Sequence, residues 1–152
     1  MKGTNKLSSH FTVGEVAYHA RDGKTYYPDA HAFDMLRMTC TLILEPMREA
    51  YAAKVHETIP IYILSGGGYD PLYDASGKWI SHRSSKTTQH HHGGAIDFRI
   101  GVKKAVDWDI QWAYQFVLDR LEALGIEGGV GLYADGKNLF VHIDLRQKRA
   151  RW

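Results

Sequence analysis

The chain has 152 residues, of which 44% are hydrophobic and 24% are charged, and its formal net charge is +2. This length allows one domain with a substantial core, so we expect a single domain over residues 1–152. So small a net charge gives no indication of nucleic-acid binding. The single cysteine, Cys40, excludes an intrachain disulfide and a zinc site built from several cysteines.

The first 20 residues contain no apolar run of the length of a signal peptide, and no segment has the length and apolar character of a membrane span. We therefore expect a protein that is made in the cytoplasm and does not insert into a membrane. The sequence leaves the oligomeric state open, with a monomer favoured.

In the first half of the chain, apolar residues recur every three or four positions between residues 29 and 56, which predicts an amphipathic helix. Pro46 must either kink this helix or begin a second one, because proline removes a backbone donor. Residues 59–64, IPIYIL, are rich in β-branched side chains and predict a short strand. Residues 65–89 are rich in Gly, Ser, Asp and Lys, and we expect a long loop; such loops in small domains are often functional.

In the second half, residues 95–100 predict another strand. Asp107 is expected to cap a helix that ends at Gly125. Residues 129–133 and 139–145 predict a hairpin around residues 134–137. The helices lie mostly outside the strand cluster in sequence, so the expected class is α+β, with a small, mostly antiparallel sheet flanked by helices.

Two of the predicted strands place ionisable residues on one face. In residues 139–145 the aliphatic side chains alternate with Phe140, His142 and Asp144, and Asp97 has the same relation to the aliphatic side chains of residues 95–100. A solvated outer face of an antiparallel sheet would explain this pattern without any function. However, His and Asp are poor strand formers, and a plain solvated face would favour Thr, Lys or Glu.

A run of three histidines, His90 to His92, precedes the strand that carries Asp97. One histidine of this run, Asp97 and His142 would form a set of two histidines and one carboxylate. Catalytic zinc takes three such ligands and leaves a fourth position for water. Neighbouring histidines also occur in loops that bind no metal, so the spacing alone leaves both interpretations open.

The same residues form a pattern that resembles the zinc D-alanyl-D-alanine carboxypeptidase-like peptidases, which share a fold with the hedgehog signalling domain. The family's first motif is Ser/Thr-x-His-x-x-Gly-x-Ala-x-Asp. The second, in bacterial and phage members, is similar to Gly-Val-Gly-x-Tyr followed by Phe-Val-His-x-Asp. The matching positions here are Thr88, His90, Gly93, Ala95, Asp97, residues 129–133 and residues 140–144. Residues 7–15 and 149–152 also resemble phage-associated members, so the resemblance covers nearly the whole chain.

The resemblance implies that His90, Asp97 and His142 bind Zn²⁺, and it assigns no role to His91 and His92. It also implies hydrolysis of peptidoglycan peptide stems by a carboxypeptidase or endopeptidase, in some members during phage lysis. Such an enzyme would act on the cell wall after release or delivery, which fits the lack of an apolar leader.

One departure from the family concerns the general base. Many members carry a glutamate three residues before the last zinc histidine, where this chain has Leu139. We expect Asp144 to act as the base or, alternatively, as an outer partner that orients His142. Glu127 is a weaker candidate for the base.

A second departure concerns substrate binding. Related members carry Ser-Gly-Tyr-Arg-Ser after the first strand, but residues 65–70 contain no arginine. Arg83 or Arg146 could bind a substrate carboxylate in its place. Both departures leave a second function open, namely a zinc-containing cell-wall-binding module or phage structural component that has lost turnover.

Overall fold

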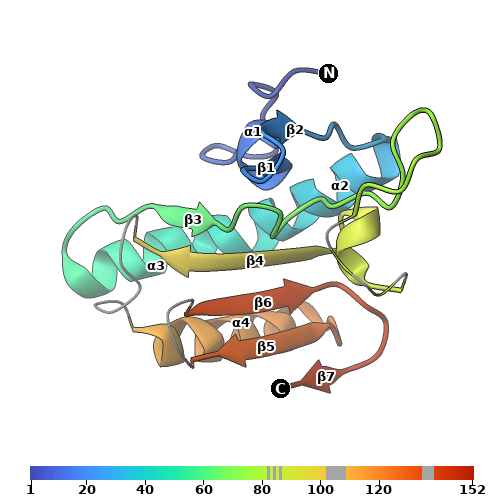
Figure 1. The fold of residues 1–152 in the computed structure, drawn as a ribbon. Helices are drawn as coiled ribbons and strands as arrows, with labels where there is room; N and C mark the ends of the chain where they lie inside the picture. Colours follow the sequence, from blue (N-terminus) through green and yellow to red (C-terminus); the bar gives the residue numbers. More distant parts are fainter. Residues whose placement is uncertain (82, 84, 86, 102–108, 135–138) are drawn as a thin grey trace.

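The computed structural model describes residues 1–81, 83, 85, 87–101, 109–134 and 139–152 (Figure 1). Its N-terminal part holds a short helix, α1 (Val13–Val16), and a two-stranded antiparallel sheet of β1 (Tyr18–His19) and β2 (Lys24–Thr25). These short elements have too few residues to give a periodic sequence signal, and the sequence did not predict them. Val13 and Val16 are buried in the core.

The helix expected over residues 29–56 is confirmed as a run of three segments. These are α2 (Ala30–Thr39), a π-helical turn η1 (Cys40–Leu44) and α3 (Glu45–Val55). Asp29 caps the run, since its carboxylate accepts the Ala32 N–H at 2.8 Å. Pro46 lies in the first turn of α3, directly after the π-turn. The proline therefore begins a new helical segment, the second of its two expected effects, at a position where the missing N–H is least costly.

A five-stranded sheet forms the centre of the molecule. Its strands are β3 (Ile61–Ile63), β4 (Ala95–Ile100), β5 (Gly129–Tyr133), β6 (Phe140–Asp144) and β7 (Ala150–Arg151). They lie in the order β3-β4-β6-β5-β7, and every neighbouring pair is antiparallel except β5 and β7. The four strands that the sequence predicted are confirmed, although β3 is shorter than expected and β7 was not predicted. The expected turn at 134–137 lies, beyond Ala134, outside the described residues.

Helix α4 (Ile110–Leu124) ends at Gly125, which has a positive φ of 68°, as expected for a glycine C-cap. The prediction of its cap was wrong: Asp109 caps α4 by accepting the Trp112 N–H at 2.9 Å. Asp107 itself lies outside the described residues. Both aspartates precede the same apolar pattern, and only the residue next to the first helical turn can reach its free N–H groups.

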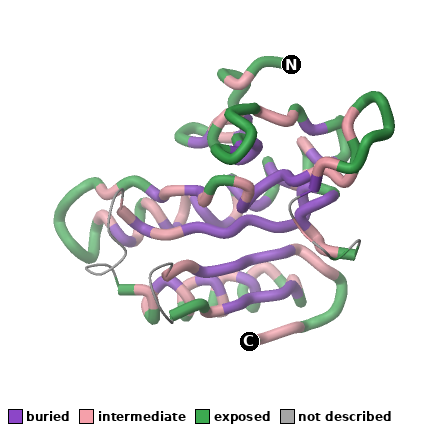
Figure 2. Tube along the Cα trace, in the orientation of Figure 1, coloured by how far each residue is buried: buried purple, intermediate pink, exposed green. Residues whose placement is uncertain are grey.

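The long helices cover one face of the sheet, behind the strands in the view of Figure 1. The aliphatic side chains of β4, β5 and β6 point toward them, and the central strands are buried along their length (Figure 2). The chain is thus an α+β protein with a small antiparallel sheet and a mixed five-stranded sheet, as predicted in class. No helix in the described ranges has the length and apolar character needed to span a bilayer.

Candidate metal centre

The pairing of β4 with β6 brings Asp97 and His142 together on the face of the sheet opposite the helices. The two residues are direct cross-strand partners in the antiparallel register. His90 comes from the short 3-10 helix η2 (Gln89–His92), which leads into β4. Gly93 ends that helix with φ 72°, and a Cβ there would collide with the backbone of Ala32. The chain therefore turns tightly at this glycine, and only glycine fits its close approach to α2.

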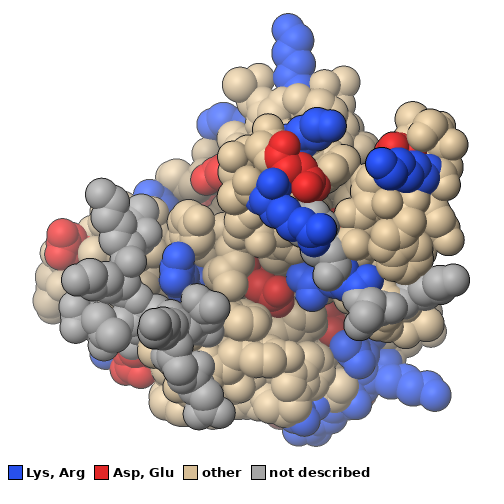
Figure 3. Space-filling view, viewed as in Figure 1, with Lys and Arg blue, Asp and Glu red and all other residues tan. Residues whose placement is uncertain are grey.

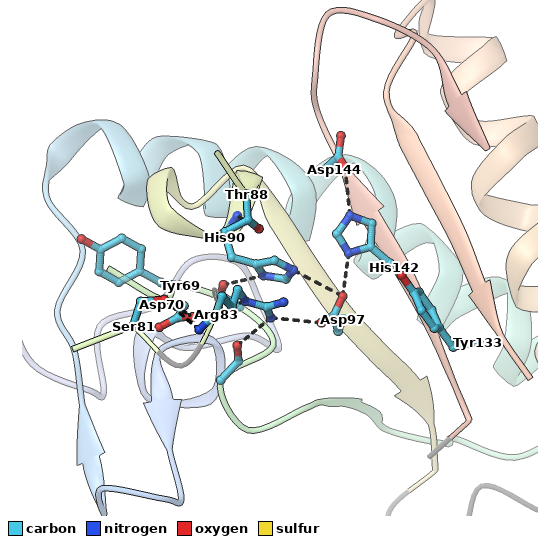
Figure 4. A network of polar contacts seen from close by, with 12 residues as sticks. Tyr69, Asp70, Ser81, Arg83, Thr88, His90, Asp97, Tyr133, His142 and Asp144 are labelled. Carbon is cyan, nitrogen blue, oxygen red and sulfur yellow. Dashed lines mark hydrogen bonds and ion pairs between the residues drawn. The ribbon is translucent and has the colours of Figure 1, made fainter. Parts of the chain in front are cut away.

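The three side chains point toward one another (Figure 4). The Nδ1 of His142 lies 2.7 Å from Oδ1 of Asp97, and the Nε2 of His90 lies 3.5 Å from the same oxygen. Their potential ligand atoms all fall within 4.8 Å of one another. All three residues are at most 7% exposed, so the alternative of a solvated sheet face does not hold at these positions.

The second nitrogen of each histidine is held in place, which tests whether the cluster fits a metal. His90 Nδ1 donates to the Gly68 carbonyl at 3.0 Å, so its Nε2, which faces Asp97, is the nitrogen left to bind a metal. His142 Nε2 donates to Asp144 Oδ2 at 2.9 Å, and its Nδ1 faces the cluster. Metal-binding histidines are usually fixed in this way by their other nitrogen. The buried His90–Asp97–His142 cluster could therefore hold a metal ion.

The side chains of the cluster shift one another's pKa values. Burial by itself would raise the pKa of Asp97, but hydrogen bonds and charge from His142 and His90 outweigh it and hold that pKa well below its usual range. Burial would lower the pKa of His142, but Asp144 and Asp97 raise it. A cation could thus take the place of the His142 proton between the two ligands, since metal binding releases protons from its ligands.

Arg83 lies beside the cluster, as the sequence suggested. Its Nη2 lies 3.4 Å from Asp97 Oδ2 and donates to the Gly66 carbonyl at 3.1 Å. Its Nε lies 3.3 Å from Asp70 Oδ2, and Asp70 is almost fully buried. The loop between β3 and η2 therefore supplies a fixed cationic group at the candidate metal centre, with 31% of its side chain exposed.

Asp144 lies behind His142. Its carboxylate accepts the Gly129 N–H at 3.1 Å, the Arg146 N–H at 3.1 Å and the Arg146 Nε–H at 2.7 Å, besides its bond from His142. Burial would raise the pKa of Asp144, but His142 and Arg146 lower it well below its usual range. The side chain is fully buried and does not line the cleft. These contacts match the expected alternative of an outer partner that orients His142.

Glu127 and the two other histidines of the run lie apart from the cluster. Glu127 lines a different depression, between α4 and the basic residues Arg149 and Arg151. His91 is buried and holds together two parts of the loop between β3 and η2. Its ring nitrogens lie 2.6 Å from the Asp70 carbonyl and 2.8 Å from the Ser85 carbonyl. His92 is exposed. The sequence pattern gave neither histidine a role, and the structure gives His91 one in loop packing.

A cleft of about 500 Å³ opens onto the cluster. Arg83 and the hydroxyl groups of Ser85, Thr87 and Thr88 line one side, and Arg146 with an aromatic group lines the other. In Figure 3, which views the same face as Figure 1, Lys and Arg side chains gather around partly covered acidic ones. A larger depression of about 620 Å³ lies against α3. Within the described ranges, however, only the cluster of His90, Asp97 and His142 has the ligands to hold a metal ion.

The aromatic group consists of Tyr133, Phe140 and Trp152, and the sequence analysis did not identify it. A signal was present in the two glycines of β5. A Cβ on Gly129 would overlap the Asp144 carboxylate, and one on Gly131 would overlap the Trp152 indole. Glycine inside a strand often marks a close approach by another group.

Comparisons with known proteins give no relative for this chain. No family model matches it, and neither a curated protein nor a solved structure matches it significantly.

Proposed function

We propose that the protein is a zinc-dependent peptidase that hydrolyses peptidoglycan peptide stems, with the fold of the zinc D-alanyl-D-alanine carboxypeptidase-like family. The observation that carries this proposal is the convergence of His90, Asp97 and His142 in one cleft. The resemblance singled out these three residues from two separate motifs, and Asp97 of the first lies 45 positions before His142 of the second. A chance motif match would not require the three side chains to meet.

The donor set supports zinc as the ion. Two imidazoles and one carboxylate suit Zn²⁺, whereas Ca²⁺ and Mg²⁺ prefer sites made of oxygen ligands. When bound, such an ion supplies Lewis-acid chemistry, which polarises a peptide carbonyl and makes a water molecule more acidic. The chain's part is to hold the ligand set rigid, and the contacts of Gly68 with His90 and of Asp144 with His142 do so.

The two arginines support an anionic substrate. Arg83 and Arg146 are 31% and 34% exposed, and both line the cleft although each is already paired with an aspartate. Their remaining N–H groups can donate to a peptide carboxylate, which a peptidoglycan stem carries. In the reaction, the oxygen of water adds to the scissile carbonyl carbon, the C–N bond breaks, and a proton passes to the leaving nitrogen.

One observation favours the second candidate function, a wall-binding module without turnover. Among the described residues that line the cleft, Asp97 is the one carboxylate, and it is a ligand of the proposed ion. A proton acceptor for the attacking water is therefore not apparent in the described part of the cleft. This candidate predicts zinc binding and affinity for wall fragments without bond cleavage.

Zinc content and wall digestion distinguish the two functions. We expect about one zinc per chain by elemental analysis, and peptide fragments with new termini when purified peptidoglycan is digested and analysed by mass spectrometry. The double substitution of His90→Ala and His142→Ala should remove both results, whereas the matched control His92→Ala, at an exposed position, should keep both. Zinc at full stoichiometry in the double variant would refute the site. Zinc and wall binding without fragments on any wall type would favour the binding module.

A further inference from the structure

Trp152 lies against the sheet beside the metal centre. Its backbone extends the pairing of β7 with β5: Trp152 N–H donates to the Val130 carbonyl at 3.1 Å, and its carbonyl accepts the Leu132 N–H at 2.7 Å. The indole lies over Gly131, whose missing side chain leaves the space for it. The backbone bonds and this glycine together fix where the indole stands.

The indole connects the metal centre to a tyrosine. Its ring centroid lies 5.2 Å from that of His142, and the Arg146 guanidinium lies 5.3 Å from it. Its Nε1–H donates to the Tyr133 hydroxyl at 2.6 Å. The Tyr133 ring also stacks on Phe140 at 4.3 Å between centroids, with 10° between the ring planes. The position of the hydroxyl is therefore fixed from two sides.

The direction of this hydrogen bond determines what the hydroxyl can do. An indole N–H can only donate, so the Tyr133 oxygen must be the acceptor. The hydroxyl proton then points elsewhere, and none of the described residues accepts it. Tyr133 is 40% exposed and lines the same cleft as His90, Asp97 and His142. The Tyr133 hydroxyl is therefore held at the cleft, with its O–H left to donate to a bound molecule.

We infer that Tyr133 donates a hydrogen bond to the carbonyl oxygen of the peptide being cleaved, and that Trp152 is the positioning residue that holds its hydroxyl. This inference rests on the proposed peptidase function. A fixed donor aimed at an oxygen that gains negative charge stabilises the transition state more than the substrate, because it needs no reorganisation during the reaction. Arg83 borders the opposite side of the cluster and already contacts Asp97 and Gly66, so the two donors serve different substrate groups.

Tyr133→Phe tests the donor, because it removes the hydroxyl and keeps the stacked ring. We expect kcat to fall by about 10²-fold with KM within a few-fold and zinc content unchanged, the usual effect of removing one such donor. Trp152→Phe keeps an aromatic ring but removes the N–H, and should also lower kcat. Because Trp152 acts through the Tyr133 hydroxyl, the double variant should be no slower than Tyr133→Phe alone. Tyr27→Phe, at a tyrosine that is 51% exposed, is the matched control and should keep the wild-type rate.

Binding of a phosphinate dipeptide, which carries oxygens in the tetrahedral arrangement, gives a readout that does not need turnover. By calorimetry, Tyr133→Phe should weaken phosphinate binding by roughly the factor lost in kcat/KM. The affinity for the product peptide, which has no tetrahedral centre, should stay the same. A wild-type kcat in Tyr133→Phe, or additive losses in the double variant, would overturn the inference and leave the peptidase proposal intact. Wild-type protein that neither cleaves peptidoglycan nor binds the phosphinate would refute both.

Discussion

Replacing Asp144 by Asn separates its two expected roles, general base and partner of His142. The Asp144 carboxylate accepts bonds from His142 Nε2, from the Gly129 N–H, and from the backbone and side chain of Arg146. An asparagine keeps one acceptor oxygen and replaces the other by an NH₂ group, which can only donate. If the oxygen stays toward Gly129, the NH₂ group faces the Nε2–H of His142, and two donors then meet. His142 Nε2 can accept from the NH₂ group only if the ring carries its proton on Nδ1 instead.

That change affects the nitrogen that would bind the metal. A proton on Nδ1 of His142 must be displaced before this nitrogen can act as a ligand, and the negative charge behind the ring is also lost. Loss of such an outer partner typically weakens metal binding by 10- to 100-fold, which is about 1.4–2.8 kcal/mol. Arg146 also loses a charged partner. Because Arg146 is 34% exposed, solvent weakens its ion pair with Asp144, and we count only part of that pair's energy. We expect the free energy of unfolding to fall by about 2 kcal/mol, which lowers Tm by roughly 4–8 °C.

Competition for zinc with a chromophoric chelator measures the affinity, and thermal melting of the metal-free protein measures the stability. Asp34→Asn is the matched control, because it makes the same chemical change at an aspartate on α2 that is 64% exposed and paired with Arg37. Its affinity and Tm should stay at the wild-type values. A variant of Asp144 with unchanged zinc affinity but a collapsed rate would contradict this reasoning and identify Asp144 as the base.

Three further outcomes follow from other contacts. Glu127→Gln should keep the wild-type rate of fragment release, because Glu127 lines a different depression; a dead variant would make it the base. His91→Ala should keep its zinc but lose about 1–3 kcal/mol in the free energy of unfolding, because the ring contacts with the Asp70 and Ser85 carbonyls, at least one of them a donated hydrogen bond, are lost. Loss of zinc would show that the wrong histidine of the run was assigned. Burial would raise the pKa of Glu45, but hydrogen bonds from Ser8 and His10 outweigh it and lower that pKa. The ionised Glu45 carboxylate therefore stabilises the fold fully above the ordinary glutamate pKa of about 4.3. This stabilisation is lost as the pH falls through the lowered pKa of the folded state. The stability gap between wild type and Glu45→Gln should therefore be full at pH 6 and close in acid; a gap independent of pH would contradict this.

The elements that the sequence predicted are those whose local signals agree with their burial. The helical periodicity of residues 29–56 matched a run of helix because its apolar side faces the sheet. The alternation in β4 and β6 matched two strands because one face of each packs on the helices. The elements that the sequence did not predict, α1, β1, β2 and β7, are two to four residues long and depend on their neighbours for hydrogen bonds.

The residues of the candidate metal site were also indicated in the sequence. Residue types and spacing pointed to Asp97, His142 and one histidine of the run, since two histidines and a carboxylate are a typical zinc ligand set, and the family resemblance selected His90. Local pattern could not distinguish a solvated sheet face from a buried cluster, since alternation is the same in both.

Only the tertiary structure decided what surrounds that set. The register of β4 against β6 places Asp97 opposite His142, and a shift of one residue would have put His142 on the helix side. The same register puts Asp144 behind His142 rather than in the cleft, and parallel pairing of β7 with β5 brings Trp152 over Gly131. These relations join residues far apart in the chain through pairing and packing. Apart from the two glycines of β5, the sequence gives no local indication of them, because their free energy arises only when the strands meet.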